Sequence, residues 1–170
     1  MPVTREQVVT ALLPDEPQYD QAARWGADAL PYLTELVRGD DPNLASKAAS
    51  LAVRIRDEGS LQVLSEAAQH PHPVVRIATA GELWRLGSLG IGPIVLKLLA
   101  DPDPQVRLLA VTSAVRVPEP ADVEERLEAI ALRDPVPEVR ARATDALRRT
   151  GRLDHLRDLV KHGRRGQSRS

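Results

Sequence analysis

Apolar residues recur along the chain at intervals of three, four and seven, which is the spacing of one face of an α-helix. One such stripe consists of Leu44, Ala48, Leu51, Ala52 and Ile55. Three similar stripes begin at Val75, Val106 and Val139. No segment shows the strict alternation of a half-buried β-strand, and no hairpin dipeptide such as Asn-Gly occurs. The pattern therefore predicts an all-α protein.

A proline stands just before each stripe. These prolines are Pro42, Pro73, Pro104 and Pro137, so their spacings are 31, 31 and 33 residues. Proline is tolerated in the first turn of a helix, where its missing N–H would have no partner in any case. Asp41 and Asp103 directly precede two of the prolines, where a carboxylate can cap the helix. We therefore predict a repeat array with one helix starting at each proline.

A second helix is predicted in each interval between these helices, over residues 29–38, 61–69, 91–100 and 123–133. Shorter helices are expected at the front, over 4–13 and 17–25, and at the back, over 153–162. Thr4 followed by Gln7 has the spacing of a capping box. Because one repeat cannot bury the apolar faces of two helices, neighbouring repeats must stack. The prediction is an α-solenoid of about five antiparallel helix pairs, as one domain over residues 1–162, with a flexible basic tail over 163–170.

The turn segments carry a family resemblance. Residues 101–107 read Asp-Pro-Asp-Pro-Gln-Val-Arg, residues 134–140 read Asp-Pro-Val-Pro-Glu-Val-Arg, and residues 70–76 are a weaker copy. These segments resemble HEAT repeats, and among them the short bacterial repeats named after phycocyanobilin lyases. The resemblance covers roughly residues 17–160. It implies the solenoid fold, and it implies a protein-binding role more than any other, because only a few relatives are chromophore lyases or DNA glycosylases.

The resemblance also implies a ladder of ion pairs between repeats. In such repeats an aspartate of the turn pairs with an arginine of a neighbouring helix. Matching residues here are Asp101, Asp134, Arg76, Arg107 and Arg140. Ala45 and His70 depart from the pattern.

Composition narrows the classes of function. The chain has no Cys and no Phe, and Trp and Tyr together make 2% of it. Without cysteine there is no disulfide framework, thiolate metal site or thiol nucleophile. No apolar run is long enough to cross a membrane, and no signal peptide is recognised, so we expect a cytoplasmic protein that does not bind membranes.

The net charge of −1 conceals an uneven distribution. Residues 1–40 sum to −4, residues 41–136 to −3 and residues 137–170 to +6. A basic end can attract a phosphate backbone, so weak nucleic-acid binding through the C-terminal end is one alternative function. That end has no aromatic residue to stack on a base, which makes nucleic acid an unfavoured partner.

Catalytic and metal-binding motifs are not found. His70 and His72 are two residues apart and have no third ligand nearby, so we interpret them as turn residues rather than a metal site. The glycines between Gly87 and Gly92 follow no strand, which favours a turn over a phosphate loop. We therefore predict no catalytic residue, no metal and no cofactor.

Alignment of the repeats identifies candidate binding residues. Two equivalent positions, seven residues apart, are apolar in the middle copies and lie off the core stripe: Ile77, Trp84, Leu108 and Val115. They either form a site for a partner, in which Trp is typical of a hot spot, or pack between neighbouring helices. The next position is arginine in every copy: Arg24, Arg54, Arg85, Arg116 and Arg149. These arginines either complement helix dipoles or form a basic ridge that grips an acidic peptide, and Glu82 is expected to pair with one of them.

The sequence thus favours a non-enzymatic adaptor or scaffold. Its partner would be another protein, bound through an acidic or apolar peptide segment at the surface formed by Ile77, Trp84, Leu108, Val115 and the arginines. A bilin lyase-like enzyme subunit or chaperone is the second alternative, beside the nucleic-acid binder.

Overall fold

The four prolines that mark the repeats each begin a helix in the computed structural model, which describes residues 3–87, 90–116 and 121–151. These helices are α4 (Pro42–Ile55), α6 (Pro73–Glu82), α8 (Pro104–Ala114) and α10 (Pro137–Arg149). The Asp41 carboxylate accepts hydrogen bonds from the backbone N–H groups of Asn43 and Leu44, at 2.9 and 3.2 Å. Asp103 caps α8 in the same way. Proline thus marks the start of all four helices, and a capping carboxylate adds to it at α4 and α8.

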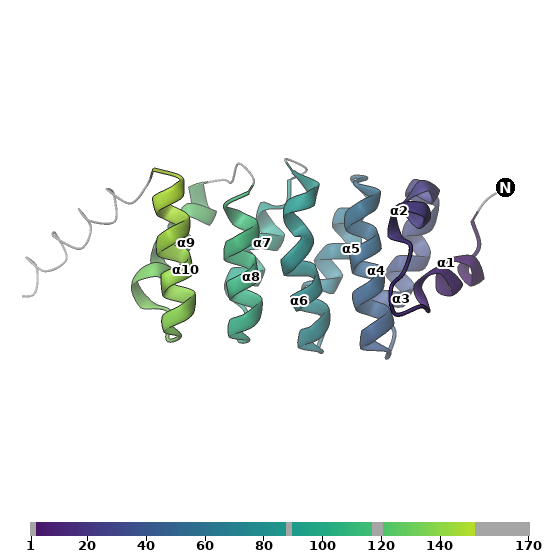
Figure 1. Cartoon of the computed structure of the whole chain (residues 1–170), viewed down its shortest axis with the longest axis horizontal. Helices are drawn as coiled ribbons and strands as arrows, with labels where there is room; N and C mark the ends of the chain where they lie inside the picture. The colour runs from purple at the N-terminus through teal and green to yellow at the C-terminus, as the bar shows by residue number, and fades with distance from the viewer. Residues whose placement is uncertain (1–2, 88–89, 117–120, 152–170) are drawn as a thin grey trace, which may run out of the picture.

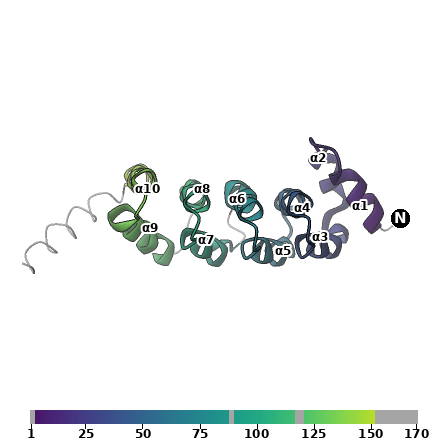
Figure 2. The same ribbon diagram turned by 90° about the horizontal axis from the view of Figure 1, so that it is seen from below.

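The intervening helices form a second layer. They are α3 (Leu30–Val37), α5 (Ser60–Ala67), α7 (Gly92–Leu99) and α9 (Ala121–Arg133). Figure 1 shows the helix pairs side by side in chain order, and Figure 2 shows α4, α6, α8 and α10 in one row above α3, α5, α7 and α9. The predicted all-α solenoid is confirmed, and the part of the chain that is described contains no strand. None of its helices has the length and apolar character that a membrane span requires.

The N-terminal unit is shorter and less regular. It consists of α1 (Arg5–Leu12), α2 (Tyr19–Ala22) and a 3-10 segment, η1 (Ala23–Ala29). The predicted capping box is present, since Thr4 and Gln7 exchange hydrogen bonds between side chain and backbone. Gly26 has a φ of 58°, which glycine adopts without a steric penalty, and it redirects the chain into α3. As a result α2 lies beside α4 (Figure 2).

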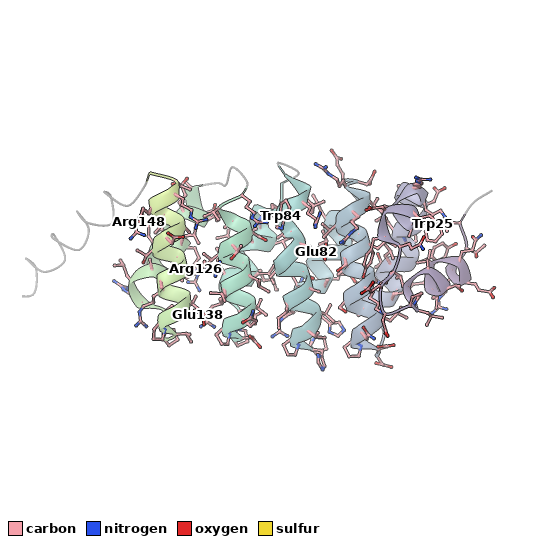
Figure 3. All side chains as sticks on the ribbon, viewed as in Figure 1. Trp25, Glu82, Trp84, Arg126, Glu138 and Arg148 are labelled. Atoms are coloured by element: carbon pink, nitrogen blue, oxygen red, sulfur yellow. The ribbon has the colours of Figure 1, made fainter. Side chains whose placement is uncertain are left out.

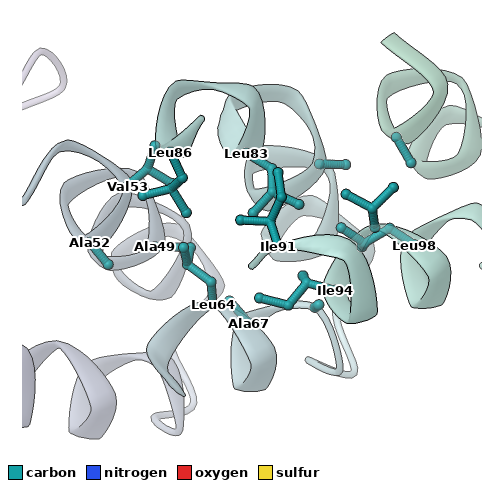
Figure 4. Packing of buried hydrophobic residues seen from close by; sticks show 14 of the residues in the cluster. Ala49, Ala52, Val53, Leu64, Ala67, Leu83, Leu86, Ile91, Ile94 and Leu98 are labelled. Carbon is teal, nitrogen blue, oxygen red and sulfur yellow. The ribbon is translucent and has the colours of Figure 1, made fainter. Parts of the chain in front are cut away.

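Small aliphatic residues build the core between the two layers (Figure 4). Ala49, Ala52 and Ala67 are fully buried, as are Leu64 and Leu98. Alanine lets helices approach closely, so leucine and valine side chains of the next repeat fill the remaining space. The core therefore continues from repeat to repeat without a phenylalanine.

Two ion pairs of the ladder implied by the family resemblance are present, along the edge where α6 and α8 begin, while Arg140 donates to the backbone carbonyls of Asp134 and Pro135. Arg76 donates two hydrogen bonds to the carboxylate of Asp101, at 2.8 and 3.0 Å. Arg107 and Asp134 repeat this contact at 2.8 and 2.9 Å. Each arginine also donates to two backbone carbonyls of its own turn. Consecutive repeats are thereby held by bidentate pairs as well as by the apolar core.

Two predictions differ from the structure or fall outside it. The helix that starts at Pro73 keeps α-helical winding only to Glu82, directly after the weak helix former Gly81, and ends in a 3-10 segment, η2 (Leu83–Leu86). Trp84 and Arg85 are therefore on η2 rather than on a continuous α-helix. The helix predicted over 153–162 and the tail over 163–170 lie outside the described residues.

Candidate protein-binding surface

Arginine occurs in the same place in successive repeats, at the edge opposite the ladder. Arg54 lies in the last turn of α4, Arg85 lies in η2, and Arg116 follows the last turn of α8. Arg24 is in η1, at the N-terminal end of the series. We call Arg24, Arg54, Arg85 and Arg116 the arginine row. The stacking of the repeats, rather than any single helix, places them in succession.

Trp84 lies within this row. Its indole N–H donates to the carbonyl of Gly81 at 3.1 Å, which fixes the ring against the end of α6. The guanidinium groups of Arg85 and Arg116 both lie over the ring, 4.9 and 4.5 Å from its centroid. Trp84 remains partly exposed. Figure 3 shows it on the side of α6 that faces α8. One aromatic ring thus positions two arginines from neighbouring repeats.

Glu82 lies on the opposite side of α6, toward α4 (Figure 3). Its carboxylate pairs with Arg54 at 2.5 Å and with Arg85 at 3.5 Å. The hydroxyl of Ser50 donates to the same carboxylate at 3.2 Å. The prediction that Glu82 pairs with an arginine of the series is therefore confirmed. Because Glu82 binds Arg54 and Arg85 through one oxygen, it holds these two guanidinium groups close together despite their like charge.

Tyr19 completes this arrangement, and sequence reasoning missed it. Its ring lies under the Arg54 guanidinium, 4.3 Å from ring centroid to the central carbon. Burial raises the pKa of the Tyr19 hydroxyl, while the charge of Arg54 opposes that rise. Tyr19 and the adjacent chain line an open hollow of about 630 Å³ together with Arg24, Arg54 and Arg85. No periodic signal marks Tyr19, because α2 belongs to the irregular N-terminal unit.

The remaining candidates have different surroundings. Ile77, Leu108 and Val115 are partly buried and pack against the core, as the alternative of packing between helices requires. Arg149, at the end of α10, pairs with Asp145 of its own helix at 2.9 Å. The structure thus brings together Trp84, Arg54, Arg85 and Arg116, while Arg149 is engaged separately.

His70 and His72 are turn residues. His70 accepts the backbone N–H of His72 at 3.0 Å, as Asp101 accepts that of Asp103 at 2.9 Å in the next repeat. His72 in turn accepts the backbone N–H of Val74 at the start of α6. Within the three described ranges, no group of three or more potential ligands is arranged to hold a metal ion.

The comparison with protein families agrees with this architecture. A family model of HEAT repeats matches residues 63–148 and, in a second register, residues 92–169. The matched region spans residues 63–169 of the 170, which is more than half of the chain. No curated protein matches the sequence.

Proposed function

Because the chain belongs to the HEAT-repeat family, whose members generally mediate protein–protein interaction, we propose that it is a non-enzymatic adaptor. It binds another protein through the surface that contains Trp84 and the arginine row. The observation that carries the proposal is the contact of Trp84 with Arg85 and Arg116, from two successive repeats. Trp and Arg are the side chains most typical of binding hot spots.

Three features of this surface support a binding role. Trp84 is partly exposed, so part of its indole is accessible to a partner. Arg85 keeps 45% of its side chain exposed while it contacts both Glu82 and Trp84. The contacts also hold the arginines in fixed positions before a partner arrives, which reduces the side-chain entropy lost on binding.

The proposal is tested by capture from an extract of the cells that produce the protein. Immobilised wild type is compared with Trp84→Ala and, as a matched control, with Trp25→Ala. Trp25 is also partly buried, but it lines a separate hollow with residues of α1. We expect one or more proteins, identified by mass spectrometry, to be retained by wild type and Trp25→Ala and lost with Trp84→Ala. Melting temperatures of all three are measured in parallel. Unchanged capture by Trp84→Ala, together with a large fall in its melting temperature, would show that Trp84 serves packing alone.

A further inference from the structure

The guanidinium group of Arg140 is held in the position of a ladder arginine. Arg140 stands three residues after the proline that begins its helix, as Arg76 and Arg107 do. Its Nη1 group donates to the carbonyls of Asp134 and Pro135, at 2.7 and 3.2 Å. The Nη1 group of Arg107 donates to two carbonyls of its own turn in the same way, at 2.8 and 3.1 Å. The turn before α10 thus orients Arg140 as the earlier turns orient their arginines.

The other edge of the Arg140 guanidinium group is unfilled. In Arg76 and Arg107, the Nε and Nη2 groups donate to an aspartate of the following repeat, at distances between 2.8 and 3.0 Å. In Arg140 these two groups have no partner among residues 3–87, 90–116 and 121–151. Such an edge fits one carboxylate through two parallel hydrogen bonds. Because α10 is the last described helix of the stack, Arg140 presents a carboxylate site at its C-terminal end (Figure 1).

The sequence after α10 has no aspartate at the spacing of a ladder pair. Asp101 and Asp134 stand 25 and 27 residues after the arginines that they bind. At the corresponding places after Arg140 the sequence has Arg165 and Gln167, and residues 159–170 include no acidic residue. This favours a carboxylate that comes from a second chain.

The opposite end of the stack has acidic side chains without a cation. The turn between α1 and α2 reads Pro-Asp-Glu-Pro over residues 14–17. Asp15 and Glu16 are exposed, and neither forms an ion pair with another residue of the described chain. Lys47 donates to the carbonyl of Pro14 at 2.8 Å, which attaches this turn to α4. One end of the stack therefore has a ladder arginine without an acid, and the other has turn acids without an arginine.

We infer that copies of this chain associate head to tail, with Asp15 or Glu16 in the α1–α2 turn of one copy supplying a carboxylate to Arg140 of the next. The two groups lie at opposite ends of the stack, so they do not meet within one chain (Figure 1). Charge supports this contact, since residues 1–40 sum to −4 and residues 137–170 to +6. The inference goes beyond the proposed function and uses neither Trp84 nor the arginine row.

Sedimentation equilibrium of the full chain tests the inference. A head-to-tail contact leaves a free end on each copy, so association continues beyond the dimer. At about 50 mM salt we expect the weight-average mass to rise above that of one chain as the concentration increases from about 10 to about 500 μM. At about 500 mM salt the mass should fall back toward that of one chain, because salt screens the ion pair.

Charge reversal tests the two ends separately. Arg140→Glu and the double variant Asp15→Arg/Glu16→Arg should each weaken association about tenfold or more, because like charges then face each other. An equimolar mixture of the two variants should associate again, since each contact in it joins opposite charges. A contact in which Arg140 of both copies meets the same surface would not be restored in this way.

Arg142→Glu is the matched control. It makes the same change of charge at an exposed position of α10, but Arg142 donates to the hydroxyl of Thr112 in α8 rather than facing the end of the stack. We expect it to change the association constant less than about twofold. Circular dichroism and melting curves show whether each variant is folded. If Arg140→Glu is not folded, Arg140→Gln replaces it, and its mixture with the double variant should then stop at dimers.

The outcomes distinguish this inference from the proposed function. A wild type that keeps the mass of one chain at every concentration and salt overturns head-to-tail association, and so does a mixture that fails to associate. If the wild type stays a single chain and Arg140→Glu loses a protein in the capture experiment, the site belongs to a different protein and self-association is again overturned. Trp84→Ala should associate as the wild type does, so its loss of capture tests the proposed function alone.

Discussion

At the scale of single residues, the Arg107–Asp134 pair is the most buried ion pair of the described ranges. The two side chains are 9% and 4% exposed. Hydrogen bonding from Arg107 lowers the pKa of Asp134, with a smaller contribution from the backbone N–H of Val136. Because this pKa is lower in the folded chain than in the unfolded one, the stabilisation is complete above the ordinary aspartate value of about 4 and is lost as the pH falls through the folded value.

Asp134→Asn is therefore expected to lower the free energy of unfolding by about 3 kcal/mol at neutral pH, because it leaves Arg107 buried without a counter-charge. The deficit relative to wild type should narrow below a pH of about 4. Urea unfolding at several pH values measures both effects. The control is Asp145→Asn, whose carboxylate is 40% exposed and pairs within α10, and its effect should stay below about 1 kcal/mol. A deficit that is independent of pH would contradict the linkage.

The backbone of Arg56 is in a strained conformation. It is the residue after α4 and has a φ of 56°, the only positive φ of a non-glycine residue in the described ranges. A Cβ atom in this left-handed conformation costs about 1–2 kcal/mol, which glycine avoids. We expect Arg56→Gly to raise the free energy of unfolding by about 1 kcal/mol, as measured by denaturant titration. Arg56→Ala retains the Cβ atom and should give no such gain, and a similar gain in both variants would assign the effect to loss of the arginine side chain.

At the scale of helices and turns, the ladder lacks one rung. Ala45 occupies the position that Arg76 and Arg107 hold in later repeats, and His70 occupies that of Asp101. His70 still accepts the backbone N–H that the aspartate would accept, so the turn is kept without the ion pair. An open hollow of about 640 Å³ lies at this junction, lined in part by Gly39, Asp40 and His70. Ala45 itself is fully buried, so an arginine at this position would have to reach the hollow from the core side.

The double variant Ala45→Arg/His70→Asp should restore the rung. The single change Ala45→Arg would place a charge at a fully buried position without a partner. The single change His70→Asp would introduce a carboxylate that lacks its cation. We expect the free energy of unfolding of the double variant to exceed, by about 1–3 kcal/mol, the value obtained by adding the effects of the two single changes. A double-mutant cycle of unfolding free energies measures this coupling, and additivity within about 0.5 kcal/mol would show that the hollow does not admit the ion pair.

The same elements show how far sequence reasoning extends. Helix starts at Pro42, Pro73, Pro104 and Pro137 were predictable because proline and the capping residues act locally. The ion pair of Glu82 with Arg54 and Arg85 was predictable in part, since the repeat register marks Glu82 as unusual. The contact of Tyr19 with Arg54 was not, because it depends on how η1 redirects α2 toward α4. The 3-10 winding at Trp84 was missed because apolar spacing does not distinguish the last turn of a helix from a 3-10 turn.

At the scale of the whole molecule, each helix pair contacts mainly the pairs next to it. The free energy needed to open a repeat should therefore differ from one part of the stack to another. A core substitution is therefore expected to loosen its own repeat and the neighbours first. Leu98, fully buried in α7, and Leu51, fully buried in α4, allow this to be tested at two places of similar burial.

Leu98→Ala should lower stability by about 3 kcal/mol through the cavity it leaves. Hydrogen exchange is then expected to accelerate in α7 and α8, next in α6 and α9, and least in α4, because local opening needs only the contacts of adjacent repeats to break. Leu51→Ala should move the region of fast exchange to α3, α4 and α6. Mass spectrometry of peptic fragments resolves these segments. Equal acceleration over the whole chain in both variants would mean that the solenoid unfolds as one cooperative unit, in which a partner bound at the arginine row would stabilise every repeat equally.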